Sequence, residues 1–168
     1  TRDRFEGDCI WRGRVIKLVD TGGLDIDKKD EMDQRIKEQA LAAIEDAEMI
    51  MFVVDLKAGL QSEDRELAEQ VQKMNKPVVV VGNKADNNNI RQNMNNKEWF
   101  TWPFGAPIPV SAKHGKGSGD LLDAIFDTLD EENIPAADIQ DVATIRVTVL
   151  GKPNAGKSSL LNAMLGED

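Results

Sequence analysis

The sequence predicts an α/β sandwich, in which a mostly parallel sheet lies between two layers of helices. Its apolar runs are short, rich in valine and isoleucine, and separated by segments whose apolar residues recur every three or four positions. At 168 residues the chain is long enough to bury such a sheet, but too short for two full domains of this class. We therefore expect one domain.

The strands and helices follow from these patterns in chain order. Residues 5–13 and 14–19 flank a tight turn at Arg12-Gly13-Arg14, which predicts an antiparallel hairpin at one edge of the sheet. The other strands are expected at 49–55, 76–84, 107–112 and 144–151. Amphipathic helices are expected near 30–47, 62–75 and 119–130, with Ser62 capping the second.

Composition excludes several classes of function. A net charge of -9 and a pI near 4.7 disfavour direct binding of nucleic acid by this segment alone. One cysteine, Cys9, rules out an internal disulfide and suits a reducing compartment, and the lone His114 leaves no pair for a zinc site. The longest apolar runs fall far short of the ~20 residues that a membrane helix needs. No secretory pattern opens the chain, so we expect a cytoplasmic protein with no membrane partner.

Four polar motifs, DTGG, NKAD, SAK and GKPNAGKS, each begin at or directly after the carboxyl end of a predicted strand. In open α/β sheets, ligands bind at the edge formed by these strand ends. We therefore expect the four motifs to form one pocket.

The last motif fits the phosphate-binding pattern G-x-x-x-x-G-K-S between a predicted strand and an apolar helical stretch. Its glycines let backbone amides converge on a phosphate chain, Lys157 reaches the outer phosphates, and Ser158 can bind Mg²⁺. The alternative is a glycine-bearing connection with no ligand. The expected cofactor-binding residues here are Gly151, Lys152, Pro153, Asn154, Ala155, Gly156, Lys157, Ser158 and Ser159.

The DTGG motif follows the predicted strand 14–19. Alone it is typical of a turn, because aspartate and glycine fill turns for conformational reasons. Beside a phosphate loop, Asp20 can hold the metal through water, and the Gly23 amide can meet a terminal phosphate.

The NKAD motif predicts the base that is recognised. The Asp86 carboxylate can accept two parallel hydrogen bonds from guanine, whereas adenine offers an acceptor at that edge. Asn83 and Lys84 complete this base-side set, and the alternative is a polar loop. Backbone N–H groups of the SAK motif are placed to meet the guanine oxygen, and its residues are Ser111, Ala112 and Lys113.

With these motifs the chain resembles the translational class of P-loop GTPases, and within it the Der/EngA family of tandem GTPases that act in assembly of the large ribosomal subunit. The resemblance covers nearly the whole chain, through TRDR, KLVDTGG, FVVD, NKAD, WPFGAPIPVSA and GKPNAGKSSLLNAML. It implies a three-layer P-loop GTPase fold, with a mostly parallel six-stranded sheet and one antiparallel edge strand. It also implies that the domain binds GTP and GDP with Mg²⁺ and hydrolyses GTP, and that the full-length protein meets the large ribosomal subunit.

The resemblance also assigns roles to single residues. Thr1 matches the switch threonine that closes on Mg²⁺, which gives Ser158, Thr1 and Asp20 as the metal set. Leu24 stands where many small GTPases carry the glutamine that orients water. The family shares an apolar residue there and is associated with stimulation by K⁺, for which Asn154 is the matching ligand. The catalytic set is Lys157, Asn154, Gly23 and Thr1.

The motif order departs from the usual one, because the phosphate loop comes last and the expected fold is circularly permuted. The chain is either a permutant or a segment that joins two units of a tandem protein, and the linker-like IPAADIQDVA favours the segment. In both cases one domain, 1–168, comprises residues 1–133, a connector at 134–143, and the first strand, phosphate loop and first helix at 144–168. The connector spans up to ~33 Å if extended, so both a monomer and a swapped dimer are open.

Two other classes of function compete with a slow, Mg²⁺-dependent and K⁺-stimulated GTPase. One is a switch or scaffold that binds GDP and GTP with negligible hydrolysis, which Leu24 and the interrupted switch favour. The other is an ATP-using kinase or transporter module, against which Asp86 argues.

Overall fold

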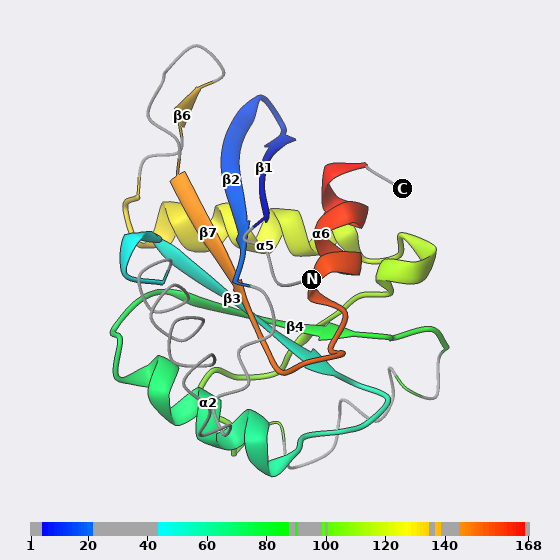
Figure 1. The fold of residues 1–168 in the computed structure, drawn as a ribbon. Helices are drawn as coiled ribbons and strands as arrows, with labels where there is room; N and C mark the ends of the chain where they lie inside the picture. The colour runs from blue at the N-terminus through cyan, green and yellow to red at the C-terminus, as the bar shows by residue number, and fades with distance from the viewer. Residues whose placement is uncertain are drawn as a thin grey trace.

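A mixed sheet runs through the middle of the computed structural model, which describes residues 5–21, 44–87, 90, 99, 101–134, 137–138 and 145–166 (Figure 1). Along the sheet the strands are β1 (Phe5–Trp11), β2 (Arg14–Asp20), β7 (Ile145–Leu150), β3 (Met49–Asp55), β4 (Val78–Asn83) and β5 (Ile108–Pro109). Neighbours from β2 to β5 are parallel, and β1 is antiparallel to β2 at the edge. The α/β architecture and the antiparallel edge pair are confirmed. A seventh, two-residue strand, β6 (Ala137–Asp138), pairs off this path with the start of β2.

The β1–β2 hairpin has the tightest possible connection. Trp11 pairs with Arg14, so Arg12 and Gly13 alone form the turn, with φ angles of 49° and 81°. Positive φ at both central residues matches the twist of two antiparallel strands. The hairpin lies where the sequence predicts it, although Arg14 already belongs to β2.

The central position of the sheet belongs to β7, which is last in the chain. Ile16 of β2 pairs with Ile145, and Ile50 of β3 pairs with Thr148. Because β2 and β3 meet only through β7, this strand joins the two halves of the sheet. Residues far apart in the sequence therefore reach one edge of the sheet together.

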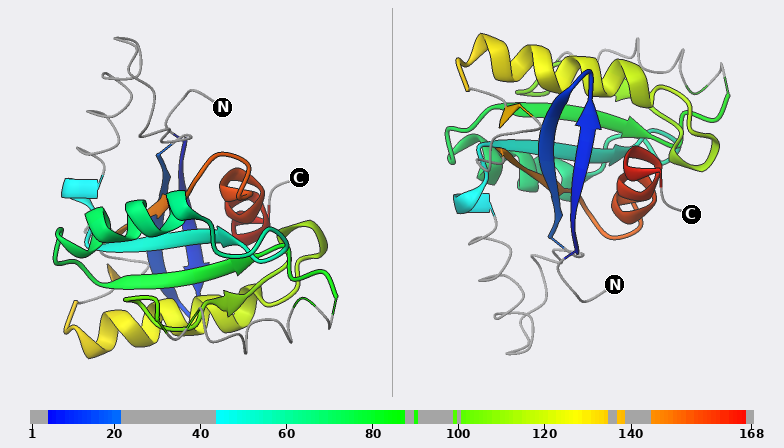
Figure 2. Two further views of the ribbon diagram at one scale, coloured as in Figure 1. Left: turned by 90° about the horizontal axis from the view of Figure 1, so that it is seen from below. Right: turned by 90° about the horizontal axis from the view of Figure 1, so that it is seen from above.

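Helices cover both faces of the sheet. Figure 2 shows α2 (Ser62–Gln72) on one side of β3 and β4, and α5 (Ser118–Glu131) on the other, with α6 (Lys157–Leu165) beside β1. The side chains of β3 alternate between two buried clusters. Met49, Met51 and Val53 pack with α5 and α6, whereas Ile50, Phe52 and Val54 pack with α2. A strand buried on both faces explains the unbroken apolar run MIMFVV.

The structure differs from the predicted elements in three places. The N-cap of α2 is Gln61 rather than Ser62, and its N–H donates to the Asp64 Oδ2 at 3.0 Å. This helix ends at Gln72. The strand expected at 107–112 is only two residues long, because a strand that includes Pro109 lacks an N–H for the ladder. Most of the helix expected near 30–47 lies outside the described residues, and of its described part residues 44–46 are helical.

No helix in the described ranges combines the length and apolar character needed to cross a membrane.

Candidate functional site

The connection between β7 and α6 turns sharply around two glycines. A side chain at Gly151 would place its Cβ 2.3 Å from the Val53 carbonyl oxygen, and one at Gly156 would meet Asn83 Nδ2 at the same distance. Gly156 also has a φ of 88°, and Asn154 between them has a φ of 64°. The glycines of the motif are therefore required by close approach of the neighbouring strands. The loop leads into the start of α6, and the N–H groups of a helix start are suited to binding an anion.

Asn83 at the end of β4 joins three segments. Its Nδ2 donates to the carbonyls of Ala155 at 2.9 Å and Gly156 at 3.3 Å. Its Oδ1 accepts the N–H groups of Lys84 at 2.8 Å and Ala112 at 3.1 Å. The side chain is buried and all its polar atoms are used. Asn83 therefore positions the phosphate loop and the base-side segment instead of offering an atom to the pocket.

Lys157 is the first residue of α6 and is buried to 6% exposure. Its Nζ donates to the carbonyls of Gly151 at 2.8 Å and Lys152 at 3.0 Å, so it folds over the loop that carries it. Burial lowers the pKa of the Lys157 ammonium, and the Asp20 carboxylate raises it in part. A cation in this position is stabilised by an anion that enters the loop.

A hydroxyl and a carboxylate that could bind a metal ion lie within hydrogen-bond distance of each other, on Ser158 and Asp20. The Ser158 hydroxyl donates to Asp20 Oδ2 at 2.8 Å, and Asp20 is buried at the end of β2. The Thr21 hydroxyl donates to the Val149 carbonyl at 2.9 Å and ties this strand end to β7. A hydroxyl and a carboxylate are hard donors of the type that Mg²⁺ prefers, so these two residues fit such an ion.

On the opposite side of the loop lie the residues expected to read the base. The Ser111 hydroxyl donates to Asp86 Oδ1 at 2.6 Å, and Ser111 is buried while Asp86 is exposed. Lys113 follows in a 3₁₀ turn, η2 (Ala112–His114). Within the described part of the chain, the Asp86 carboxylate is thus held by Ser111 through one of its two oxygens.

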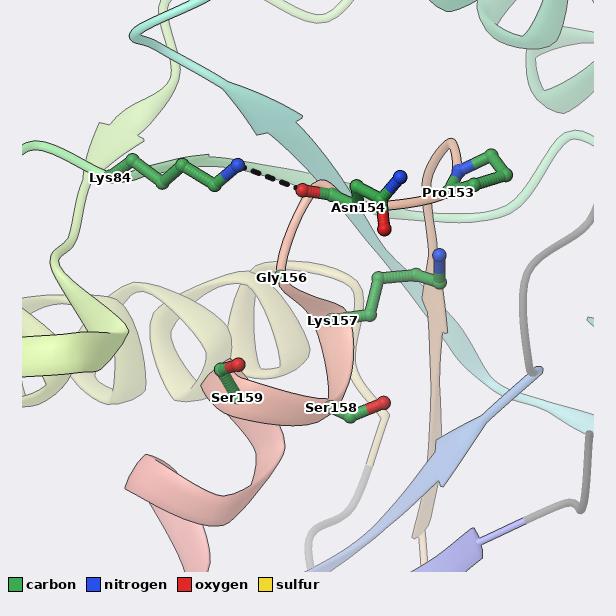
Figure 3. A pocket seen from close by; sticks show the side chains of 7 residues that line it. All are labelled: Lys84, Pro153, Asn154, Gly156, Lys157, Ser158 and Ser159. Carbon is green, nitrogen blue, oxygen red and sulfur yellow. Dashed lines mark hydrogen bonds between the residues drawn. The ribbon is translucent and has the colours of Figure 1, made fainter. Parts of the chain in front are cut away.

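A cavity of about 430 Å³ opens over the loop (Figure 3). Its lining comes from the end of β4, the loop and the start of α6, and consists of Lys84, Pro153, Asn154, Gly156, Lys157, Ser158 and Ser159. Its volume suits a small-molecule ligand. The structure brings the NKAD, SAK and GKPNAGKS motifs and Asp20 of DTGG to one edge of the sheet. Thr1, Gly23 and Leu24 lie outside the described residues.

Two carboxylates near this edge were not assigned a site role from the sequence. Asp55 ends β3 and accepts the Lys84 ammonium at 2.7 Å. Asp64 is fully buried in the first turn of α2, with Oδ2 3.5 Å from Lys152 Nζ. The place of Asp55 at a strand end was a usable signal. No signal in the sequence pointed to the contact between Asp64 and Lys152 of the loop, because these two residues meet only in the folded chain.

Comparison with known proteins agrees with these motifs. The sequence model of a family described as 50S ribosome-binding GTPase matches residues 1–84 and 146–168. Proteins named GTPase Der align with the entire chain. That of Caldanaerobacter subterraneus subsp. tengcongensis is 44% identical over 168 residues, and those of Porphyromonas gingivalis and Herpetosiphon aurantiacus are 40% and 42% identical. The chain spans 37% or 38% of the length of these relatives.

A solved structure is also similar. It is described as a probable GTP-binding protein engB, with a TM-score of 0.58 and 26% identity over 77% of this chain and 83% of that chain.

These alignments give the expected circular permutation no support. The Caldanaerobacter relative aligns with the chain from end to end over 168 residues, so the late phosphate loop stands in the same order there. The order is therefore shared with longer relatives, which agrees with the segment rather than the permutant.

Proposed function

The chain belongs to the family of 50S ribosome-binding GTPases, and from that premise we propose that its pocket binds GTP and GDP and hydrolyses GTP to GDP and phosphate. The observation that carries the proposal is the convergence of a phosphate loop and a guanine-reading motif. Asn83 of NKAD bonds directly to the loop carbonyls of Ala155 and Gly156, so one ligand can reach both.

In this proposal the two ends of the nucleotide are held by different elements. The phosphates lie in the loop 151–156 against its amides and the Lys157 ammonium. Guanine is read by the Asp86 carboxylate, which Ser111 orients from 2.6 Å, and by the backbone of Ala112 and Lys113. Catalysis rests on positioning and charge stabilisation and needs no covalent intermediate.

Ser158 and Asp20 would hold Mg²⁺, with Thr1 as the third member of the set. The ion supplies charge neutralisation at the phosphates when bound. The Ser158 to Asp20 hydrogen bond keeps both oxygens facing one another before the ligand arrives. We also assign Asn154 and Gly23 to catalysis. Asn154 is the candidate K⁺ ligand, and its place on the pocket wall supports this assignment.

The phosphate contact is tested by Lys157→Ala, with Lys73→Ala as the control. Lys73 is an exposed lysine at the end of α2 and is not one of the residues that line the cavity. Loss of the Lys157 ammonium should weaken GDP binding about 100-fold in calorimetry, the size of a charge-assisted contact, whereas Lys73→Ala should bind as the parent does. Equal binding by both variants would contradict the assignment.

The base contact is tested by Asp86→Asn. The side-chain N–H of the new asparagine would donate to the 2-carbonyl oxygen of xanthine but would face the amino donor of guanine. Affinity for GDP should therefore fall by on the order of 10³-fold while affinity for XDP rises. An unchanged preference for GDP would remove Asp86 from the guanine site.

A second candidate is a nucleotide-dependent switch with negligible hydrolysis, which is favoured by Leu24 at the position of the water-orienting glutamine. Single-turnover release of phosphate from GTP decides between the two. The proposed slow GTPase releases one equivalent, and faster in KCl than in NaCl at equal ionic strength. Equal rates in the two salts would end the K⁺ assignment, and no release would favour the switch.

The setting of the proposed activity follows from the family. We infer a cytoplasmic protein whose full-length form binds the large ribosomal subunit, and a single domain over 1–168 with 134–143 as connector. The acidic charge of -9 argues against direct RNA contact by this segment. Sedimentation of the full-length protein with 50S particles, compared with this segment alone, tests that division.

A further inference from the structure

Lys84 is held between the end of β3 and the phosphate loop. Its Nζ donates to Asp55 Oδ2 at 2.7 Å and to the Asn154 carbonyl at 2.9 Å. Figure 3 shows the Lys84 side chain extended along the pocket wall, with its ammonium at the loop. One cation therefore connects the strand end at Asp55 with the turn at Asn154.

The Asp55 carboxylate is fixed independently of Lys84. Its Oδ1 accepts the N–H groups of Lys57 at 2.9 Å and Ala58 at 3.1 Å, and its side chain is only 13% exposed. Burial alone would raise its pKa, but the contact with Lys84 and these two amides lower it below the usual value. Asp55 is thus an ionised carboxylate with one oxygen committed to its own turn and the other to Lys84.

The contact between Lys84 and Asn154 joins two residues with demanding backbone conformations. Lys84 and Asn154 are both non-glycine residues with positive φ, at 65° and 64°. Such conformations cost free energy and persist where neighbouring contacts fix them. The carbonyl of Asn154 is anchored by Lys84, and the N–H of Lys84 is anchored by Asn83.

We propose that Asp55 is a positioning residue of the nucleotide pocket, which holds the Lys84 ammonium against the Asn154 carbonyl and so keeps the phosphate loop in its binding shape. The inference rests on the proposed function, since the ligand is the guanine nucleotide. Without the carboxylate, the ammonium has only a carbonyl to bind and exchanges it for water. The loop must then be ordered when the nucleotide binds, and that ordering weakens affinity.

A purely structural role predicts a different outcome. The Asp55 side chain also closes the turn after β3, because its Oδ1 accepts the N–H groups of Lys57 and Ala58. If that turn were its only task, replacing Asp55 would have the same effect with or without Lys84. A double-mutant cycle separates the two roles because it isolates the coupling between the side chains.

The test measures binding of a fluorescent GDP to the parent chain, Asp55→Asn, Lys84→Met and the double variant. Asp55→Asn should raise Kd about tenfold in the parent and less than about twofold in the Lys84→Met background. The increase should come from faster release, with association unchanged. Asp130→Asn is the matched control, because Asp130 is also paired with a cation, Arg14, but lies on α5. Its Kd should not change.

Equal effects of Asp55→Asn in both backgrounds would overturn the positioning role, even with GDP bound tightly by the parent. Failure of the parent chain to bind GDP would instead overturn the proposed function, and the inference with it. If Asp55→Asn does not fold, Asp55→Glu takes its place in the cycle. Glutamate keeps the charge but moves it by one methylene, and the same loss and the same coupling are expected.

Discussion

Burial sets the direction of the pKa shift of three ionisable side chains within the described residues. It raises the pKa of Cys9 and of Asp64 and lowers that of Lys157, in each case as the largest cause. Only Lys157 lies on the proposed pocket, where an anionic ligand offsets the cost. The other two affect reactivity and stability, and each leads to a measurement.

The Cys9 thiol should be nearly inert in the folded protein. Burial raises its pKa to about 11, and its Sγ lies 3.7 Å from the Met164 carbonyl of α6. Since the thiolate is the reactive form, modification by a disulfide reagent at pH 8 should be at least about 100-fold slower than in denaturant. Fast modification of the native chain would show that β1 separates from α6.

Asp64 should make stability depend on pH. The carboxylate is fully buried, and its Oδ1 has no hydrogen-bond partner among the described residues. Desolvation raises its pKa despite the opposing contacts with Gln61 and Lys152. Between the unfolded value near 3.9 and the raised native value, the native state binds more protons. Stability contributed by this group is therefore lost as pH rises through that window.

Asp64→Asn removes this dependence. The amide oxygen still accepts the Gln61 N–H, and no charge is buried. Urea unfolding should give the variant a gain of about 1 kcal/mol at pH 7 that is absent near pH 4. Exposed Asp127→Asn on α5 is the control and should show no such trend. A loss at pH 7 that shrinks toward pH 4 would mean that the ion pair with Lys152 outweighs desolvation.

At the scale of elements, the hairpin is fastened to α5 at its turn. Trp11 Nε1 and Arg12 Nη2 both donate to Asp123, at 2.6 and 2.8 Å. The Arg14 guanidinium donates two hydrogen bonds to the Asp130 carboxylate, at 2.7 and 3.0 Å. Its Cζ lies 4.7 Å from the centre of the Phe126 ring. Arg12 and Arg14 thus hold the edge hairpin to its neighbouring helix.

Arg14→Ala should therefore cost about 1 kcal/mol of unfolding free energy, as expected for a bidentate pair with an added ring contact. Lys17→Ala, which removes a single pair with Asp8 on the same hairpin, should cost less than about half of that. Denaturant unfolding of both variants checks the ranking. A larger loss for Lys17→Ala would mean that the pair within the hairpin matters more than its attachment to α5.

The sequence predicts elements well where a single pattern decides them. The MIMFVV run can only be a strand buried on both faces, and the glycines of GKPNAGKS fit only a strand-to-helix turn. Prediction was poorer where a partner from another segment decides. Gln61 caps α2 because Asp64 accepts its N–H, and β6 exists because the start of β2 has a vacant edge there. Neither partner is visible in the local sequence.

The same distinction holds for the site. Its convergence follows from the rule that parallel strands end at one edge, so Asp20, Asn83 and the phosphate loop were placed together correctly. No site role was predicted for Asp55 or Asp64, because each of them contacts a single lysine from a distant segment. Nothing in the sequence indicated that the polar atoms of the Asn83 side chain bond within the protein, because their partners come together only in the folded chain.

At the scale of the whole molecule, β7 completes the sheet of its own chain. We therefore expect a monomer, with a mass of 18.6 kDa in light scattering that does not change with protein concentration. A mass that doubles as the concentration rises would indicate that β7 enters the sheet of a second copy.

The position of β7 also bears on how quickly the fold is reached. Ile16 and Ile145 are nearest neighbours across strands yet stand roughly 130 positions apart, so joining them costs far more chain entropy than closing the two-residue hairpin. The β1–β2 ribbon and the β3–β4 pair can each assemble early from shorter-range contacts. The proposed nucleotide pocket lies on the seam that β7 closes, so a chain in which β7 has not docked has two separate strand pairs and no place for a ligand.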